Sequence, residues 1–89
     1  MSFQDQYSEE LVKKLKKIKK KNSKQYSIII KKINEILNDP TRYKNLSYGM
    51  KDRKRVHIDS SFVLVFKIDF NNQIVKFLDY DHHDKIYTK

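Results

Sequence analysis

The chain has 89 residues, which is enough for one domain and too few for two. Its 20 Lys and Arg residues outnumber its 11 Asp and Glu residues, and the resulting formal charge of +9 indicates an acidic or polyanionic partner. The absence of cysteine excludes disulfide frameworks, thiol catalysis and cysteine-based zinc sites. We therefore expect a single domain over residues 1–89.

Neither a membrane span nor a secretory signal is expected. The longest apolar run, Phe62–Phe66, covers five residues, whereas a membrane-spanning helix needs about 20. The first residues, Met1–Asp5, lack the basic and apolar regions of a signal peptide. We therefore expect a soluble protein of the cytoplasm with no membrane partner.

The first predicted elements are a short strand and a helix. Phe3 and Tyr7 lie on the same side of residues 3–7 at strand spacing, which predicts a strand. Ser8 is a good N-cap for a helix over residues 9–21, which begins with two glutamates and ends in three lysines, as the helix dipole favours. The apolar stripe of this helix consists of Leu11, Leu15 and Ile18.

A second helix is predicted directly after the first. Asn22 or Ser23 caps it, with Gln25 three residues after Asn22 as in a capping box, and Pro40 ends it. Its broad apolar face consists of Tyr26, Ile29, Ile30, Ile33, Ile36 and Leu37. Because so few residues join the two helices, we expect an antiparallel helical hairpin.

The C-terminal half predicts a meander of three antiparallel strands. After a loop over residues 41–52, strands are expected at residues 53–59, 62–70 and 73–80. The strand over residues 62–70 is apolar on both sides at first, which is typical of a central strand. Residues 81–89 are a tail that is polar except for Ile86 and Tyr87. The fold class is therefore α+β, with the two helices on one face of the sheet and a basic opposite face.

Basic side chains gather on the first strand of this meander. Alternation places Arg53, Arg55 and His57 on one side of the strand, with Lys51 and Lys54 nearby. Guanidinium groups bind phosphate oxygens and an imidazole transfers protons, so this row predicts a phosphate-binding site. The alternative is a solvated face whose charges discourage aggregation.

Two further groups of residues are candidates for RNA binding or for acid–base catalysis. On the first helix, Lys13 and Lys17 belong to a lysine-rich face that would bind RNA, or that is simply solvated. Near the C-terminus, His82 and His83 are flanked by aspartates. Adjacent residues of an extended chain point to opposite faces, so we expect no metal site, and a histidine held by an aspartate would act as a general acid or base. The alternative is a pair of surface histidines.

Four short motifs follow the predicted order of strand, helical hairpin and basic meander. They are Asn45-Leu46 ahead of the basic strand, Arg55-Val56-His57-Ile58, Phe62-Val63-Leu64-Val65-Phe66, and the closing Asp81-His82-His83-Asp84-Lys85-Ile86-Tyr87. Together with the order of elements, they resemble the RelE/ParE superfamily of type II toxins. The resemblance covers essentially the whole chain.

The resemblance implies a metal-independent, cofactor-free endoribonuclease that cuts mRNA on the ribosome. The implied reaction is attack of the ribose 2′-OH on the adjacent phosphate, with proton transfer by His or Tyr. The residues that it places around the scissile phosphate are Lys54, Arg55, His57, His82, His83 and Tyr87. The implied partners are the ribosome, mRNA and a RelB-like antitoxin encoded by the neighbouring gene.

One position departs from the pattern of the superfamily. Many members carry a phosphate-binding arginine directly after the aromatic residue that opens the central strand, where this chain has Val63 after Phe62. Arg53 or Arg55 would then supply the charge from the neighbouring strand. The alternatives are a non-catalytic ParE-like toxin that inhibits DNA gyrase and a non-toxic RNA-binding module.

Overall fold

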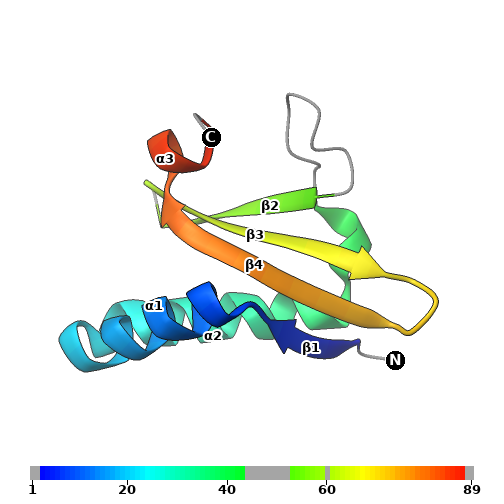
Figure 1. Ribbon diagram of the computed structural model, residues 1–89, viewed down its shortest axis with the longest axis horizontal. Coiled ribbons are helices and arrows are strands. Elements are labelled where there is room, and N and C mark those ends of the chain that lie inside the picture. Colours follow the sequence, from blue (N-terminus) through cyan, green and yellow to red (C-terminus); the bar gives the residue numbers. More distant parts are fainter. Residues whose placement is uncertain (1–2, 44–52, 60, 88–89) are drawn as a thin grey trace.

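The computed structural model describes residues 3–43, 53–59 and 61–87. Its elements are β1 (Gln4–Tyr7), α1 (Glu9–Lys21), α2 (Ser23–Asn38), the 3-10 helix η1 (Pro40–Arg42), β2 (Arg53–Ile58), β3 (Phe62–Asp69), β4 (Ile74–His82) and α3 (His83–Tyr87). The strands form one sheet in the order β1-β4-β3-β2, in which β1 is parallel to β4 and the other pairs are antiparallel (Figure 1). The predicted α+β fold is confirmed.

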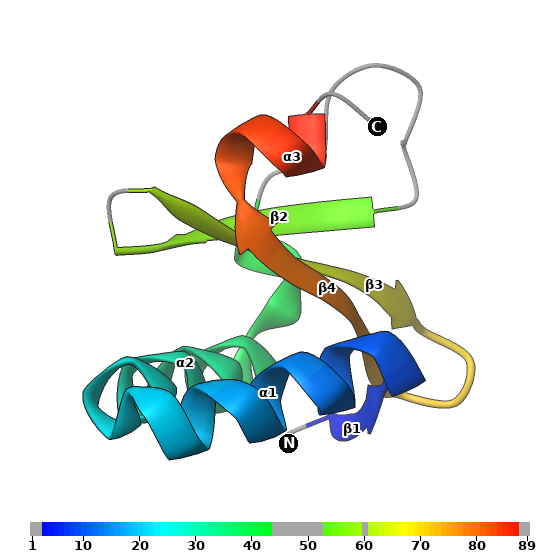
Figure 2. The same cartoon turned by 60° about the vertical axis from the view of Figure 1, so that its left-hand side comes forward.

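The helical hairpin begins at the predicted caps. The Ser8 side chain accepts a hydrogen bond from the backbone N–H of Leu11 at 3.1 Å, and Asn22 accepts one from the N–H of Gln25 at 3.1 Å. The Gln25 side chain does not return to the cap; its Nε2 donates to the hydroxyl of Tyr80 at 2.7 Å and so ties α2 to β4. Figure 2 shows α1 and α2 side by side on one face of the sheet.

The main core lies between this hairpin and the sheet. Its central aromatic contact joins the fully buried Phe66 of β3 and Phe77 of β4, with ring centroids 5.9 Å apart. The buried residues of this core are Leu11, Ile29, Ile33, Ile36, Ile58, Leu64, Phe66, Val75, Phe77 and Tyr80. They come from the predicted apolar faces of both helices and of all three meander strands, so hydrophobic burial between these two layers positions the sheet.

The opposite face of the sheet carries a second, smaller apolar cluster. Val63 and Val65 of β3 are buried there beneath Ile86 of α3, with Leu78 packed against them. The face predicted to be basic therefore also carries a buried apolar cluster, and Ile86, an apolar exception in the predicted polar tail, belongs to it. Because β3 is apolar on both sides, it needs a cover on both faces, and the five residues of α3 supply the second one.

Other differences concern boundaries. The strand β4 extends to His82, two residues beyond its predicted end, and η1 forms at the start of the predicted loop. Residues 44–52 and Ser60, where the rest of the loop and part of a turn were predicted, lie outside the described residues. Within the described part of the chain, no helix is long and apolar enough to cross a membrane.

Lys14 ties α1 to the edge of β4. Its Nζ lies 2.6 Å from an Asp79 oxygen and 3.2 Å from an Asp81 oxygen, and it also donates to the carbonyl oxygen of Tyr80. Burial lowers the pKa of Lys14, but its hydrogen bonds to the two aspartates outweigh burial and raise it. Burial raises the pKa of Asp81, but hydrogen bonds from the His82 N–H and from Lys14 outweigh burial and lower it.

Replacing Lys14 by methionine is expected to lower the free energy of unfolding by about 1–3 kcal/mol at neutral pH, because two half-buried carboxylates lose a shared cation. A lowered carboxyl pKa stabilises the fold above its ordinary value of about 4, and this stabilisation is lost as the pH falls through the folded value. The Lys14→Met variant should therefore lose less stability on acidification than the parent. Urea denaturation at neutral and acidic pH measures both effects.

The matched control is Lys13→Met, which removes an exposed lysine from the same helix. Its unfolding free energy should stay within about 0.5 kcal/mol of the parent. Equal losses in the two variants would show that the ion pairs with β4 do not stabilise the fold.

Candidate functional site

Two basic side chains of β2 project to the face that α3 covers. Arg55 pairs with Val65 and His57 pairs with Val63 in the β2–β3 register, and both valines belong to the apolar cluster under α3. Residues paired across antiparallel strands project to the same face. Arg55 and His57 therefore share one face of the sheet, as the alternation of the sequence predicts.

Each of these two cross-strand pairs continues onto β4, and we call the three paired residues a row. Val65 pairs with Asp79 and Val63 pairs with Asp81, so each row runs from a basic group over a buried valine to a carboxylate. These two carboxylates were not predicted to lie on the face of Arg55 and His57, although Asp81 stands in the closing motif and their spacing of two on a strand is the signal that they share a face. Both are held by Lys14 at the far edge of the sheet.

The accessibility of the basic groups differs along β2. Arg55 is half-buried and its Nε atom is buried, whereas His57 and Arg53 are exposed. Arg53 lies two residues before Arg55 at the start of the strand, opposite Lys67. Because part of the Arg55 side chain is buried, its guanidinium would be held in a fixed position, whereas the exposed His57 is accessible to solvent.

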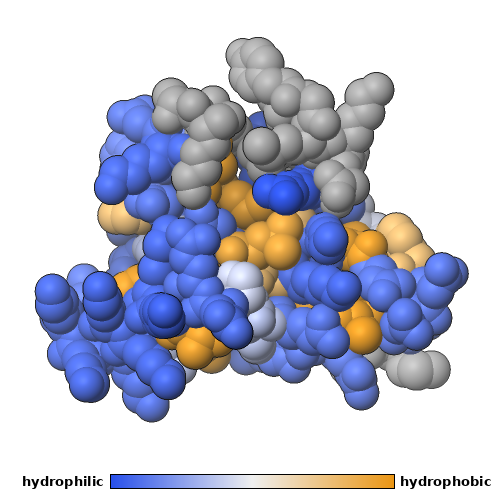
Figure 3. Space-filling model, viewed as in Figure 1, coloured by the Kyte–Doolittle hydropathy of each residue, from blue (hydrophilic) through white to orange (hydrophobic). Residues whose placement is uncertain are grey.

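The structure does not bring all predicted phosphate-binding residues to this face. Lys54 pairs with the core residue Phe66, and its Nζ donates to the carbonyl oxygen of Tyr43 at 3.0 Å on the hairpin side of the sheet. Lys13 and Lys17 lie on α1, and Lys17 lines a pocket there. In the space-filling view, hydrophilic residues cover much of the hairpin (Figure 3). Lys51 lies outside the described residues.

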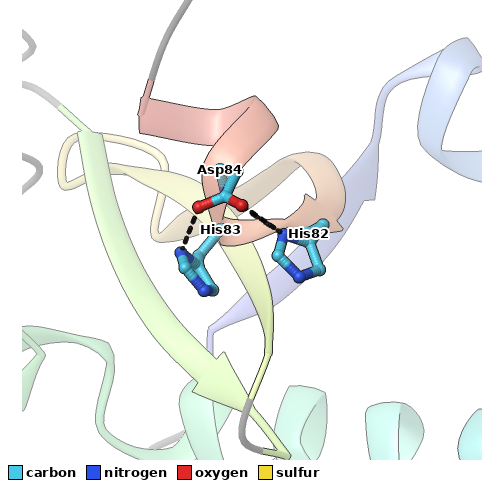
Figure 4. Close-up of side chains that lie close together, drawn as sticks. All are labelled: His82, His83 and Asp84. Atoms are coloured by element: carbon cyan, nitrogen blue, oxygen red, sulfur yellow. Dashed lines mark hydrogen bonds and ion pairs between the residues drawn. The ribbon is translucent and has the colours of Figure 1, made fainter.

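The histidine pair is arranged differently from the prediction. The rings of His82 and His83 are stacked, with centroids 4.5 Å apart and planes 28° apart, and both approach the carboxylate of Asp84 (Figure 4). The expectation that the two side chains point to opposite faces is wrong, because the strand ends at His82 and a helix begins at His83. Alternation applies only while the backbone stays extended.

The three predicted C-terminal groups lie at different places relative to Arg55 and His57. His82 pairs with Phe62, whose ring lies edge-on to it at 5.8 Å, and Phe62 pairs with the core residue Ile58, so this row projects to the hairpin face and not to the face of Arg55 and His57. His83 and Tyr87 begin and end α3, the helix that covers the Arg55 and His57 face. The side chain of Tyr87 lies outside the described residues.

Comparisons with known proteins agree on the fold and the family. No protein-family model matches the chain. A protein of Methanocaldococcus jannaschii described as "Putative toxin RelE4" is 53% identical over 79 residues, which cover 89% of this chain and 84% of that protein. In the intact RelBE toxin–antitoxin complex of E. coli, one chain matches with a TM-score of 0.77 and 23% identity, covering 91% of this chain and 96% of that chain. The archaeal RelE–RelB complex from Pyrococcus horikoshii OT3 matches with a TM-score of 0.69 and 13% identity, over 92% and 96% of the two chains.

Proposed function

Because this chain belongs to the RelE/ParE superfamily of toxin–antitoxin toxins, we propose that it is a metal-independent endoribonuclease that cleaves mRNA on the ribosome. The observation that carries the proposal is the presentation of Arg55 and His57 on one face of β2. A fixed guanidinium and an exposed imidazole, two residues apart, are the groups that phosphoryl transfer to an internal hydroxyl requires.

In the proposed reaction, the ribose 2′-oxygen bonds to the adjacent phosphorus and the bond from phosphorus to the 5′-oxygen breaks. The products are a 2′,3′-cyclic phosphate and a free 5′-hydroxyl. Arg55 stabilises the negative charge that develops on the phosphorane oxygens. His57 removes the proton of the 2′-OH, and His83 or Tyr87, at the two ends of α3, returns a proton to the departing oxygen.

The remaining basic residues are proposed to hold the RNA backbone by charge. Arg53 lies two residues before Arg55, at the start of β2, and Lys51 precedes it in the sequence. Lys54, Lys13 and Lys17 lie on the other side of the sheet and would contribute to the overall attraction rather than contact the scissile phosphate.

We also propose a RelB-like antitoxin as the protein partner. The E. coli structure that shares this fold is described as a RelBE toxin–antitoxin complex, and the P. horikoshii structure as a RelE–RelB complex. The net charge of +9 favours a partner that supplies acidic groups.

Induced expression in a bacterial host tests the nuclease. We expect translation to stop, transcripts to acquire new ends inside codons, and growth to return when the gene next to this one is co-expressed. The Arg55→Ala variant expressed to the same level is the control for overproduction of a basic protein. Arrest of translation with intact transcripts would contradict the proposed cleavage.

One observation favours a second candidate, a non-catalytic toxin that inhibits DNA gyrase. Val63 stands where many nucleases of the superfamily have a phosphate-binding arginine, and it is fully buried beneath α3, so this position presents no charge to RNA. In the same expression experiment, DNA breaks and an induced DNA-damage response with unchanged transcripts would identify this second function.

A further inference from the structure

The turn from β4 into α3 gathers three potential metal ligands on consecutive residues. An Asp84 oxygen lies 3.0 Å from Nδ1 of His83, and its other oxygen lies 3.6 Å from Nδ1 of His82. One ligand atom from each of the three residues can be chosen so that all lie within 4.8 Å of one another. Figure 4 shows the carboxylate beside both rings, with one oxygen directed to each.

These separations suit one shared ion. Zinc lies about 2.0–2.2 Å from imidazole nitrogen and carboxylate oxygen, so neighbouring ligand atoms around it are about 2.8–3.6 Å apart in octahedral or tetrahedral geometry. The separations of 3.0 and 3.6 Å, each to a different oxygen of Asp84, lie within this range. We propose that His82, His83 and Asp84 bind one divalent transition-metal ion of the zinc, nickel and copper class.

The cluster is held in place by the surrounding backbone and ring contacts. The N–H of His83 donates to the carbonyl oxygen of Ser61 at 2.9 Å, and the ring of His82 meets the edge of Phe62. The N–H of Asp84 donates to Nδ1 of His82 at 3.2 Å, so the lone pair of this nitrogen is directed toward Asp84. A metal ion at the carboxylate would take the place of that hydrogen bond.

The site is open enough to be loaded from solution. The side chains of His82, His83 and Asp84 are 38%, 41% and 74% exposed, so water would complete the coordination of an ion held by three protein ligands. Two imidazoles and one carboxylate favour zinc, nickel and copper over magnesium, which prefers oxygen ligands. The nearby Asp81 is engaged by Lys14, which lies 3.2 Å from it.

Binding at this site would also affect the proposed nuclease. An imidazole nitrogen that holds a metal ion cannot transfer a proton, so the bound ion would remove His83 from the reaction. This consequence rests on the proposed function, whereas metal binding itself does not.

Calorimetric titration of the tag-free protein with Zn²⁺ near neutral pH tests the site. We expect one ion per chain and no binding of Mg²⁺ under the same conditions. Loss of a partner that only supports a ligand lowers metal affinity about 10–100-fold, so His82→Ala, His83→Ala and Asp84→Asn should each weaken binding by at least about tenfold. All three positions are partly or largely exposed, and thermal melting will verify that the variants are folded.

The third histidine of the chain supplies the matched control. His57 is exposed on β2 and does not belong to the cluster, so His57→Ala should keep the Zn²⁺ affinity of the parent within about twofold. Ring NMR signals of His82 and His83 should broaden with paramagnetic Ni²⁺ while those of His57 stay sharp. Parent-like Zn²⁺ affinity in His82→Ala and His83→Ala would overturn the proposal, as would an equal loss in His57→Ala. Because no ribosome is present, these outcomes do not depend on the nuclease.

Discussion

Replacing Phe77 by alanine is expected to lower the free energy of unfolding by about 3–5 kcal/mol. Phe77 is fully buried at the centre of the sheet, where β4 pairs with Tyr7 of β1 on one side and with Phe66 of β3 on the other. Its ring stacks on Tyr7 at 5.3 Å and contacts Phe66 at 5.9 Å. Since small domains are stabilised by only about 5–15 kcal/mol in total, this loss would leave the variant barely folded.

Urea denaturation followed by circular dichroism measures this loss. The matched control is Phe70→Ala, because Phe70 follows β3 in the turn before β4 and is 63% exposed. The control should stay within about 0.5 kcal/mol of the parent. A Phe77→Ala variant that unfolds at the same urea concentration as Phe70→Ala would show that this aromatic contact is not the centre of the core.

Much of the fold could be predicted because its patterns are local. The caps Ser8 and Asn22 and the apolar spacing of the two helices fix the hairpin, and the structure begins each helix directly after its cap. The parallel pairing of β1 with β4 could not be predicted in this way, because alternation tells which side chains share a face but not which strand is the neighbour. The five-residue helix α3 is too short for a helical period, and Ile86 is its one buried residue among those described.

The candidate site was predictable only where the chain stays regular. Arg55 and His57 share a face because β2 is extended throughout, and both are placed as predicted. His82 and His83 were assigned to opposite faces by the same rule, which fails where β4 gives way to α3. The burial of Val63 depends on α3 as its cover, so the sequence could reveal the missing arginine but not that an arginine there would place a charge under Ile86.

Replacing Arg55 by alanine is expected to slow cleavage of ribosome-bound mRNA by about 10²–10³-fold, which corresponds to about 2.7–4 kcal/mol of lost transition-state stabilisation. Val63 offers no substitute charge on the neighbouring strand, and the row of Arg55 continues to Val65 and Asp79, so no other cation of that row replaces the guanidinium. Because Arg55 is half-buried, its removal also takes packing from the sheet. Single-turnover cleavage on programmed ribosomes, measured below the melting temperature of each variant, separates the rate from the stability.

Two further variants distinguish a charge at the phosphate from a contact that only supports the fold. Arg55→Lys keeps the positive charge and much of the stem but loses the planar fork, so its rate should lie between those of the parent and Arg55→Ala. Arg42→Ala removes an exposed arginine from η1, where its guanidinium lies over Tyr43 at 5.5 Å, and should cleave at the parent rate. If the Arg55→Ala and Arg55→Lys proteins are folded and also cleave at the parent rate, this face of β2 is not the nuclease site. The catalytic groups would then have to be sought on another face of the chain.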